Sequence, residues 1–140
     1  LVISKEKGLE GAKKLLEFCQ NPNEDAKVRA ELLSLNFQRR HRDCFGDESN
    51  LLQLWELYCS ASSVLLDHTK ESSSEVRTAF LSASECFFPL EEAFKTNGAT
   101  ATCRKAMNKA ANSDPDSSIR GTAKASLRWL GKGSTTCVLL

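Results

Sequence analysis

Glycine and proline are scarce in this chain, whose 140 residues include 7 of the first and 3 of the second. Apolar residues are spread evenly along the sequence, so this scarcity excludes collagen-like, low-complexity and wholly disordered proteins. No apolar run approaches the roughly 18 to 20 residues needed to cross a bilayer. The apolar start Leu1-Val2-Ile3 is too short for the core of a signal peptide. Because the first residue is not methionine, we expect a processed chain or a fragment of a longer one.

Acidic residues are missing from the end of the chain, although the formal net charge is only +1. Residues 1–96 contain 12 Lys and Arg against 16 Asp and Glu, whereas residues 97–140 contain 7 against 2. A basic end on an acidic body favours contact with an anionic partner, such as a membrane surface. The alternative is a solvated helix face whose cations complement the helix dipole. The candidate contact residues are Lys124, Arg128 and Lys132.

Apolar residues recur with helical spacing in six segments, and polar turns separate them. No stretch alternates in the manner of a β-strand, so the sequence predicts an all-α fold. This length supports one domain with a core, or a short array of repeats. We expect Pro89 to kink or end the fourth helix, and Asn97-Gly98 is typical of a helix C-terminus. The expected helices cover about 8–20, 25–44, 50–66, 74–88, 100–112 and 117–130. The side chains that we expect to point into the core include Val28, Leu32, Leu35, Trp55 and Trp129.

The second, fourth and sixth segments open in a similar way. Each has an acidic or hydroxyl residue, then a β-branched aliphatic residue, then arginine. The arginines are Arg29, Arg77 and Arg120, and the aliphatic residues before them are 48 and 43 positions apart. These spacings lie near the roughly 40 to 47 residues of two-helix repeats.

This pattern resembles the HEAT repeat of the HEAT/armadillo class. The resemblance implies three antiparallel helix pairs, at about 8–44, 50–88 and 99–130, in a domain at 1–131 with a flexible tail at 132–140. An irregular six-helix bundle is the alternative. The resemblance also implies that Arg29, Arg77 and Arg120 lie near the turns between repeats. There they would pair with acids such as Asp25, Glu75 and Asp116.

The six cysteines include no C-x-x-C pair, and neither His41 nor His68 lies near a pair of them. We therefore expect neither a structural metal site nor a thioredoxin-like motif. Two interpretations remain. The cysteines form three disulfide bridges of a small secreted protein, or most of them are reduced and buried. Cys19 and Cys59 fit apolar helical stripes, which favours the second.

The last four residues, Cys137-Val138-Leu139-Leu140, resemble the geranylgeranylation signal of Rho-family small GTPases. The resemblance implies a lipid on Cys137, and the basic residues at 124, 128 and 132 would supply the second membrane signal that a single lipid needs. The phosphate loop of those GTPases is absent from the sequence. If the chain continues, these residues are instead the start of another apolar segment.

No common catalytic motif is present, so we expect a protein that is not an enzyme and needs no cofactor. A cationic group at Arg39, Arg40 and Arg42 either contacts an acidic partner or complements a helix dipole. Aromatic residues are too sparse there for specific nucleic-acid binding. The Trp129 side chain is expected in the core. Because it lies near the basic end of the chain, the alternative is that it contacts a membrane interface.

The resemblance to HEAT repeats implies a non-catalytic protein-binding domain that contacts its partner through the second helix of each pair. We expect this domain to be cytoplasmic, and membrane-anchored if Cys137 is lipidated. Leu1-Val2-Ile3 is a poor end for such an array, so we expect a missing neighbour on that side. The alternative is a secreted, disulfide-bonded helical protein that acts as a signal or carries a small apolar ligand in a cavity lined by Phe80, Phe87 and Phe88.

Overall fold

The structure is a computed structural model that describes residues 8–38, 48–88, 90 and 92–131. Helices and turns account for this part of the chain, and no strand occurs in it, so the all-α prediction is confirmed. The elements are α1 (Gly8–Cys19), α2 (Ala26–Asn36), α3 (Glu48–Leu65), α4 (Ser74–Ala83), the 3₁₀ helix η2 (Ser84–Phe87), α5 (Glu92–Lys95), α6 (Gly98–Ser113) and α7 (Ser117–Leu130).

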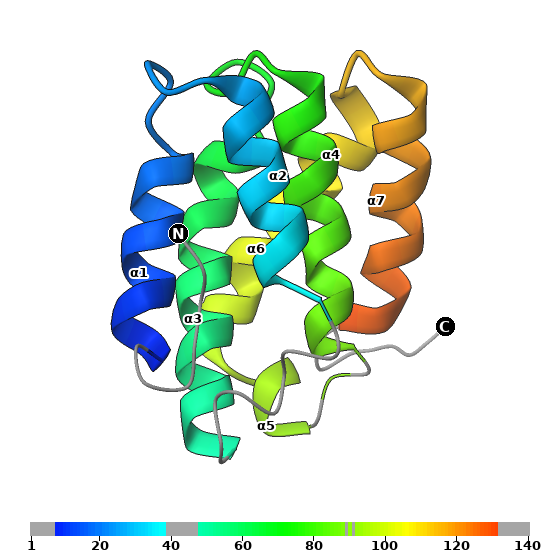
Figure 1. Ribbon diagram of the computed structural model, residues 1–140. Coiled ribbons are helices and arrows are strands. Elements are labelled where there is room, and N and C mark those ends of the chain that lie inside the picture. Colours follow the sequence, from blue (N-terminus) through cyan, green and yellow to red (C-terminus); the bar gives the residue numbers. More distant parts are fainter. Residues whose placement is uncertain (1–7, 39–47, 89, 91, 132–140) are drawn as a thin grey trace.

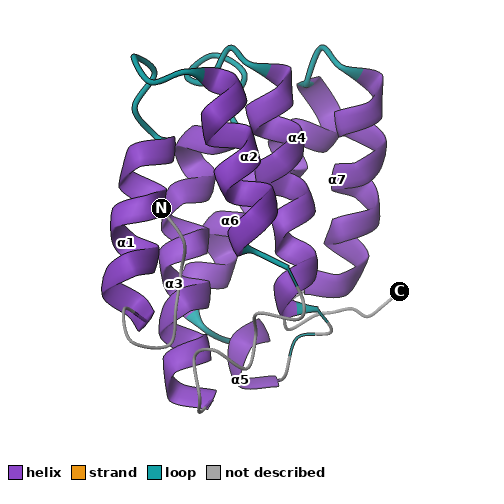
Figure 2. Cartoon of the chain, in the orientation of Figure 1, coloured by secondary structure: helices purple, strands orange, loops and turns teal. Residues whose placement is uncertain are grey.

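The longer helices form two layers. One layer contains α1, α3 and α6, and the other contains α2, α4 and α7 (Figure 1). Within each layer the helices pack side by side in that order. The second layer runs in one direction and the first in the opposite direction, so the turns that join them gather at one end (Figures 1 and 2).

Three turns end in residues that cap the next helix. Asp25 accepts a hydrogen bond from the Val28 N–H at 3.1 Å, and Asp116 accepts one from the Ser118 N–H at 2.8 Å. Ser73 caps α4 in the same way. Each cap satisfies a backbone donor that has no partner within its helix. The three helices of the second layer therefore begin at caps that the sequence supplies locally.

The two expected helix ends lie close to the expected residues. Helix α5 ends at Lys95, two residues before Asn97-Gly98, and the same residues also begin the next helix, since the Asn97 side chain accepts from the Ala99 N–H and caps α6. Asparagine suits either role, and its extended backbone here selects the N-terminal one. The fourth segment is helical up to Phe87, in agreement with an end at Pro89, but its α-helical part stops at Ala83 and a 3₁₀ helix continues it. Of the expected second helix, residues 39–44 lie outside the described part.

The core between the layers is aromatic at its centre. Tyr58 stacks on Phe80 with ring centroids 4.2 Å apart, and Trp55 also stacks on Tyr58 with centroids 5.6 Å apart. Phe37 and Phe87 complete the cluster. The polar atoms of Trp55 and Tyr58 are paired, since Trp55 Nε1 donates to Thr100 and the Tyr58 hydroxyl donates to the Phe80 carbonyl. The prediction that Trp55 belongs to the core is confirmed.

Three expected core residues are exposed instead. Val28 and Leu35 are each 47% exposed, and Trp129 is 52% exposed. Val28 and Leu35 lie on α2, the first helix of its layer, where no described helix covers the side that faces away from α4. Periodicity finds an apolar stripe in a helix, but it does not show whether another helix lies against that stripe.

Gly121 in α7 offers a direct test of the helix assignment. It is exposed, and an added Cβ would meet no atom within 4 Å. Glycine in a helix interior costs roughly 0.5–1 kcal/mol relative to alanine. We therefore expect Gly121→Ala to raise the free energy of unfolding by about that amount. Urea unfolding followed by circular dichroism measures it, and a loss of stability would contradict the open surroundings.

Candidate protein-binding face

Three buried or partly buried arginines, which we call the arginine ladder, tie the turns together. Arg29 forms two hydrogen bonds with the Glu71 carboxylate, of which Nη2 to Oε2 measures 3.3 Å. It also donates to the carbonyl oxygens of Cys19 and Glu24. The turn between α1 and α2 is thereby joined to the turn between α3 and α4.

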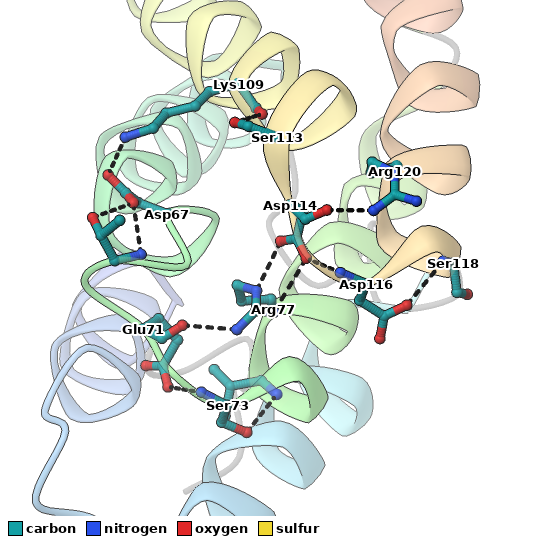
Figure 3. A network of polar contacts seen from close by, with 12 residues as sticks. Asp67, Glu71, Ser73, Arg77, Lys109, Ser113, Asp114, Asp116, Ser118 and Arg120 are labelled. Atoms are coloured by element: carbon teal, nitrogen blue, oxygen red, sulfur yellow. Dashed lines mark hydrogen bonds and ion pairs between the residues drawn. The ribbon is translucent and has the colours of Figure 1, made fainter.

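The next arginine repeats this arrangement (Figure 3). Arg77 Nε lies 2.9 Å from Asp114 Oδ2, and Nη2 lies 3.2 Å from Oδ1. Arg77 Nη1 donates to the Glu71 carbonyl at 2.9 Å. Arg120 Nη1 donates to the Asp114 carbonyl at 2.7 Å. Arg77 and Arg120 thus bind the carbonyl oxygen six residues before them, and Arg29 and Arg77 also bind the carboxylate of the following turn.

The expected acids at the helix starts are not the partners of these arginines. Asp25 and Asp116 accept from backbone N–H groups as caps, and Glu75 is exposed on α4. A helical side chain points back toward the N-terminus of its helix, so each arginine reaches under the turn. There Arg29 and Arg77 meet the carboxylate of the following turn, and Arg120 meets the Asp114 carbonyl of its own turn.

Sequence reasoning missed Glu71 and Asp114 as partners. Both stand six residues before an arginine of the repeated pattern. An acid at this fixed offset was therefore the available signal. In the first pair the same offset from Arg29 falls on Asn23, an amide.

A second polar link joins the first layer. Lys109 Nζ of α6 lies 2.8 Å from Asp67 Oδ2, and Thr69 donates to Oδ1 from its N–H at 2.9 Å and its hydroxyl at 2.6 Å. The hydrogen bond from Lys109 and those from Thr69 hold the pKa of Asp67 well below its ordinary value, and burial opposes them only in part.

The depressed pKa of Asp67 predicts a pH dependence of stability. A carboxyl whose pKa is lower in the folded chain stabilises the fold above its unfolded pKa, and this contribution is lost as the pH falls. We therefore expect Asp67→Asn to be less sensitive than the parent chain to acid between about pH 4 and pH 2. Urea midpoints measured across this range test it. The exposed Glu85→Gln is the control, and equal slopes for all three proteins would contradict the prediction.

The outer face, by which we mean the exposed surface of α2, α4 and α7, is hollowed between its helices. Between α2 and α4 lie two adjoining hollows of about 350 and 510 Å³, and between α4 and α7 lies one of about 330 Å³. Ser82 lines all three and therefore marks the centre of the face. Much of the rest of the lining is small: Ala30, Ser34, Ser74, Thr78, Ala79, Ala83, Gly121, Thr122, Ala125 and Ser126.

Trp129 stands at the hollow between α4 and α7. Its ring stacks on that of Phe88, with centroids 5.9 Å apart and planes 17° from parallel. Phe88 is buried, so it fixes one side of an indole whose other surface meets solvent. A large side chain held in this way loses little conformational freedom when a partner covers it.

Charge on the outer face changes from one side to the other. The hollows beside α4 are lined by Glu31, Glu75 and Glu85 against the single cation Lys27. Lys124 and Arg128, the candidate anion contacts, are exposed on α7. The other candidate residues, Lys132, Cys137, Arg39, Arg40 and Arg42, lie outside the described part of the chain.

The buried thiols are poor nucleophiles. Burial raises the pKa of Cys19 to about 12, with the nearby Arg29 guanidinium lowering it in part. Burial also raises the pKa of Cys59 and of Tyr58 well above their ordinary values. A protonated thiol neither attacks substrates nor binds metals effectively. Among the residues that the structure describes, no group of three potential ligands could hold a metal ion.

Two features bear on the alternative of a disulfide-bonded carrier. Three bridges would need all six cysteines, yet Cys19, Cys59 and Cys103 carry free thiols in this structure. Phe80 and Phe87 pack face and edge against Tyr58 and Trp55, and Phe88 lines the open hollow between α4 and α7.

The chain matches no protein-family model, no curated protein and no solved structure. None of the described helices is both long and apolar enough to cross a membrane.

Proposed function

We propose that this chain is a non-catalytic protein-binding domain of HEAT-like helix pairs, and that its partner lies on the outer face of α2, α4 and α7. The observation that carries the proposal is the run of hollows across this face, with Trp129 exposed at one end. Continuous grooves between parallel helices suit a helix or an extended segment of another protein.

Further support comes from the rigidity of the face. The arginine ladder holds the three turns together, and the caps fix where each helix of the layer begins. The outer face is therefore formed before binding, and a partner does not have to order it. Exposed tryptophan in a formed groove is a common centre of binding energy.

Site-specific photo-crosslinking tests this proposal. Ser82 at the centre of the outer face is replaced by a photoreactive phenylalanine, and so is Ser60, an exposed serine on α3 in the opposite layer. We expect a defined crosslinked protein from position 82 and not from position 60. Replacing Trp129 with alanine in the position-82 protein should reduce its yield by about tenfold, which corresponds to 1.4 kcal/mol.

Equal crosslinking from the two positions would contradict a specific outer face. Thermal unfolding of each variant is the control, because both serines are exposed and their replacement leaves the core unchanged. A yield that is independent of Trp129 would place the contact elsewhere on the face.

We also propose that the domain is tethered to membranes on the cytosolic side by a lipid on Cys137. Lys124 and Arg128 support this proposal, because both are exposed on the helix that precedes the tail.

Intact mass of the protein from its natural source shows whether the lipid is present and residues 138–140 are removed. For lipidated protein on vesicles containing phosphatidylserine, we expect Lys124→Gln/Arg128→Gln to weaken binding and Lys13→Gln/Lys14→Gln on α1 to leave it unchanged. Vesicle binding that stays unchanged as salt is raised to about 0.5 M would rule out a contribution from these basic residues.

A further inference from the structure

Helix α2 carries an uncovered apolar stripe formed by Val28, Leu32 and Leu35. Their spacing of four and three residues places them on one side of the helix. Val28 and Leu35 are each 47% exposed, and Leu32 is partly buried. Three large hydrophobic side chains are exposed in the described part of the chain, and two of them belong to this stripe.

The same stripe occurs in the other two helices of the layer, where it is buried. In α2 the stripe lies at fixed positions relative to the ladder arginine, Arg29. Val28 is one residue before it, Leu32 is three residues after it and Leu35 is six residues after it. All of their counterparts are less than 9% exposed. They are Val76, Phe80 and Ala83 in α4, and Ile119, Ala123 and Ser126 in α7.

The position of each helix in the layer explains this difference. The last residue of each stripe shows the direction, since Ser126 faces the hollow between α4 and α7, and Ala83 faces the hollow between α2 and α4. The stripe of α7 is thus turned toward α4, and that of α4 toward α2. Among the described elements, none occupies the matching place beside α2.

The opposite end of the layer is built differently. On α7 the exposed side chains include Lys124 and Arg128, and no acid follows Asp116 on this helix. A charged end suits the last helix of a stack that meets only water, whereas an apolar stripe does not. A second copy of the chain added head to tail would set these cations against Val28 and Leu35, so that arrangement is disfavoured.

We infer that Val28, Leu32 and Leu35 form a docking surface for an amphipathic helix of a partner protein, which lies along α2 as α2 lies along α4. The partner helix presents apolar side chains at spacings of three and four residues. Asn23 stands where the other turns have the acid of the ladder, so a partner arginine would find no carboxylate at that position of this turn. The contact therefore rests on apolar packing. The stripe residues line none of the hollows of the outer face, and the inference does not depend on the proposed function.

Crosslinking from the stripe tests the inference on the full chain. Val28 is replaced by a photoreactive phenylalanine, the chain is irradiated in cells of its source, and the crosslinked residues are located by mass spectrometry. We expect crosslinks to apolar positions of one helical segment in another protein, and Leu35→Lys should reduce their yield about tenfold or more. The same photoreactive group at Lys13, exposed on α1, is the control.

Two other results would overturn the inference. Crosslinks between copies of this chain would show that the stripe is a dimer contact. A crosslinking yield from position 28 no greater than that from position 13 would show that no partner binds the stripe. Because Leu35 is half exposed, Leu35→Lys should keep the thermal midpoint of the parent chain. Leu33→Lys, at the fully buried neighbouring position, should abolish the cooperative transition.

Discussion

Replacing Arg77 with methionine is expected to lower the free energy of unfolding by about 3–5 kcal/mol, the cost of breaking a buried ion pair from one side. Asp114 is 1% exposed and receives two hydrogen bonds from this guanidinium. Without Arg77 its carboxylate would keep only the N–H of Asp116 among the partners seen here. Urea unfolding at pH 7, followed by circular dichroism, measures the loss.

A double variant separates the buried charge from the lost packing. Asp114→Asn removes the charge but keeps an acceptor for the Asp116 N–H. We therefore expect Arg77→Met/Asp114→Asn to be more stable than the sum of the two single losses predicts. Arg128→Met, at an exposed position of α7, should change stability by no more than about 0.5 kcal/mol. A similar small effect for Arg77→Met would mean that water reaches the pair.

Replacing Tyr58 with alanine is expected to cost about 3–5 kcal/mol, as is usual for a large aromatic residue in a packed core. Tyr58 is fully buried between Phe80 and Trp55, so its removal leaves an aromatic cavity at the centre of both layers. Calorimetric or urea unfolding measures this loss. Leu57→Ala at the partly exposed neighbouring position should cost clearly less, and equal losses would contradict the central role of the cluster.

The hydroxyl of Tyr58 should contribute separately. It donates to the Phe80 carbonyl at 2.6 Å, where α4 passes into the 3₁₀ helix and the Ser84 N–H turns to the carbonyls of Leu81 and Ser82. Tyr58→Phe keeps the ring and leaves this buried carbonyl without the hydroxyl, so we expect a loss of about 1–3 kcal/mol. A neutral effect would show that the carbonyl finds another donor.

The features that the sequence predicted correctly are local ones. Apolar spacing of three and four residues located the helices, and Asp25 and Asp116 marked the starts of α2 and α7 because a cap acts on the turn next to it. Asn97 shows the limit of this reasoning, since asparagine and glycine occur at both ends of helices. In this fold α5 ends at Lys95 and α6 begins at Gly98, so Asn97 lies between two helix ends.

Relations between distant residues escaped the sequence analysis. Arg29 and Glu71 are 42 positions apart, and Arg77 and Asp114 are 37 apart, so no local pattern joins them. Val28, Leu35 and Trp129 have the spacing of core residues but lie where no described helix covers them fully. Of the candidate sites, the grooves of the outer face depend on how three separate helices pack, which only the three-dimensional structure reveals.

The arginine ladder also has a consequence for the order of synthesis. A ribosome makes Arg29 42 residues before Glu71, and Arg77 37 residues before Asp114. At about 5–20 residues per second, each guanidinium waits some seconds for its carboxylate, and longer for that segment to leave the exit tunnel. We expect the first helix pair of a growing chain to stay open to proteases until the second has emerged, and stalled nascent chains of increasing length would show the step at which protection begins.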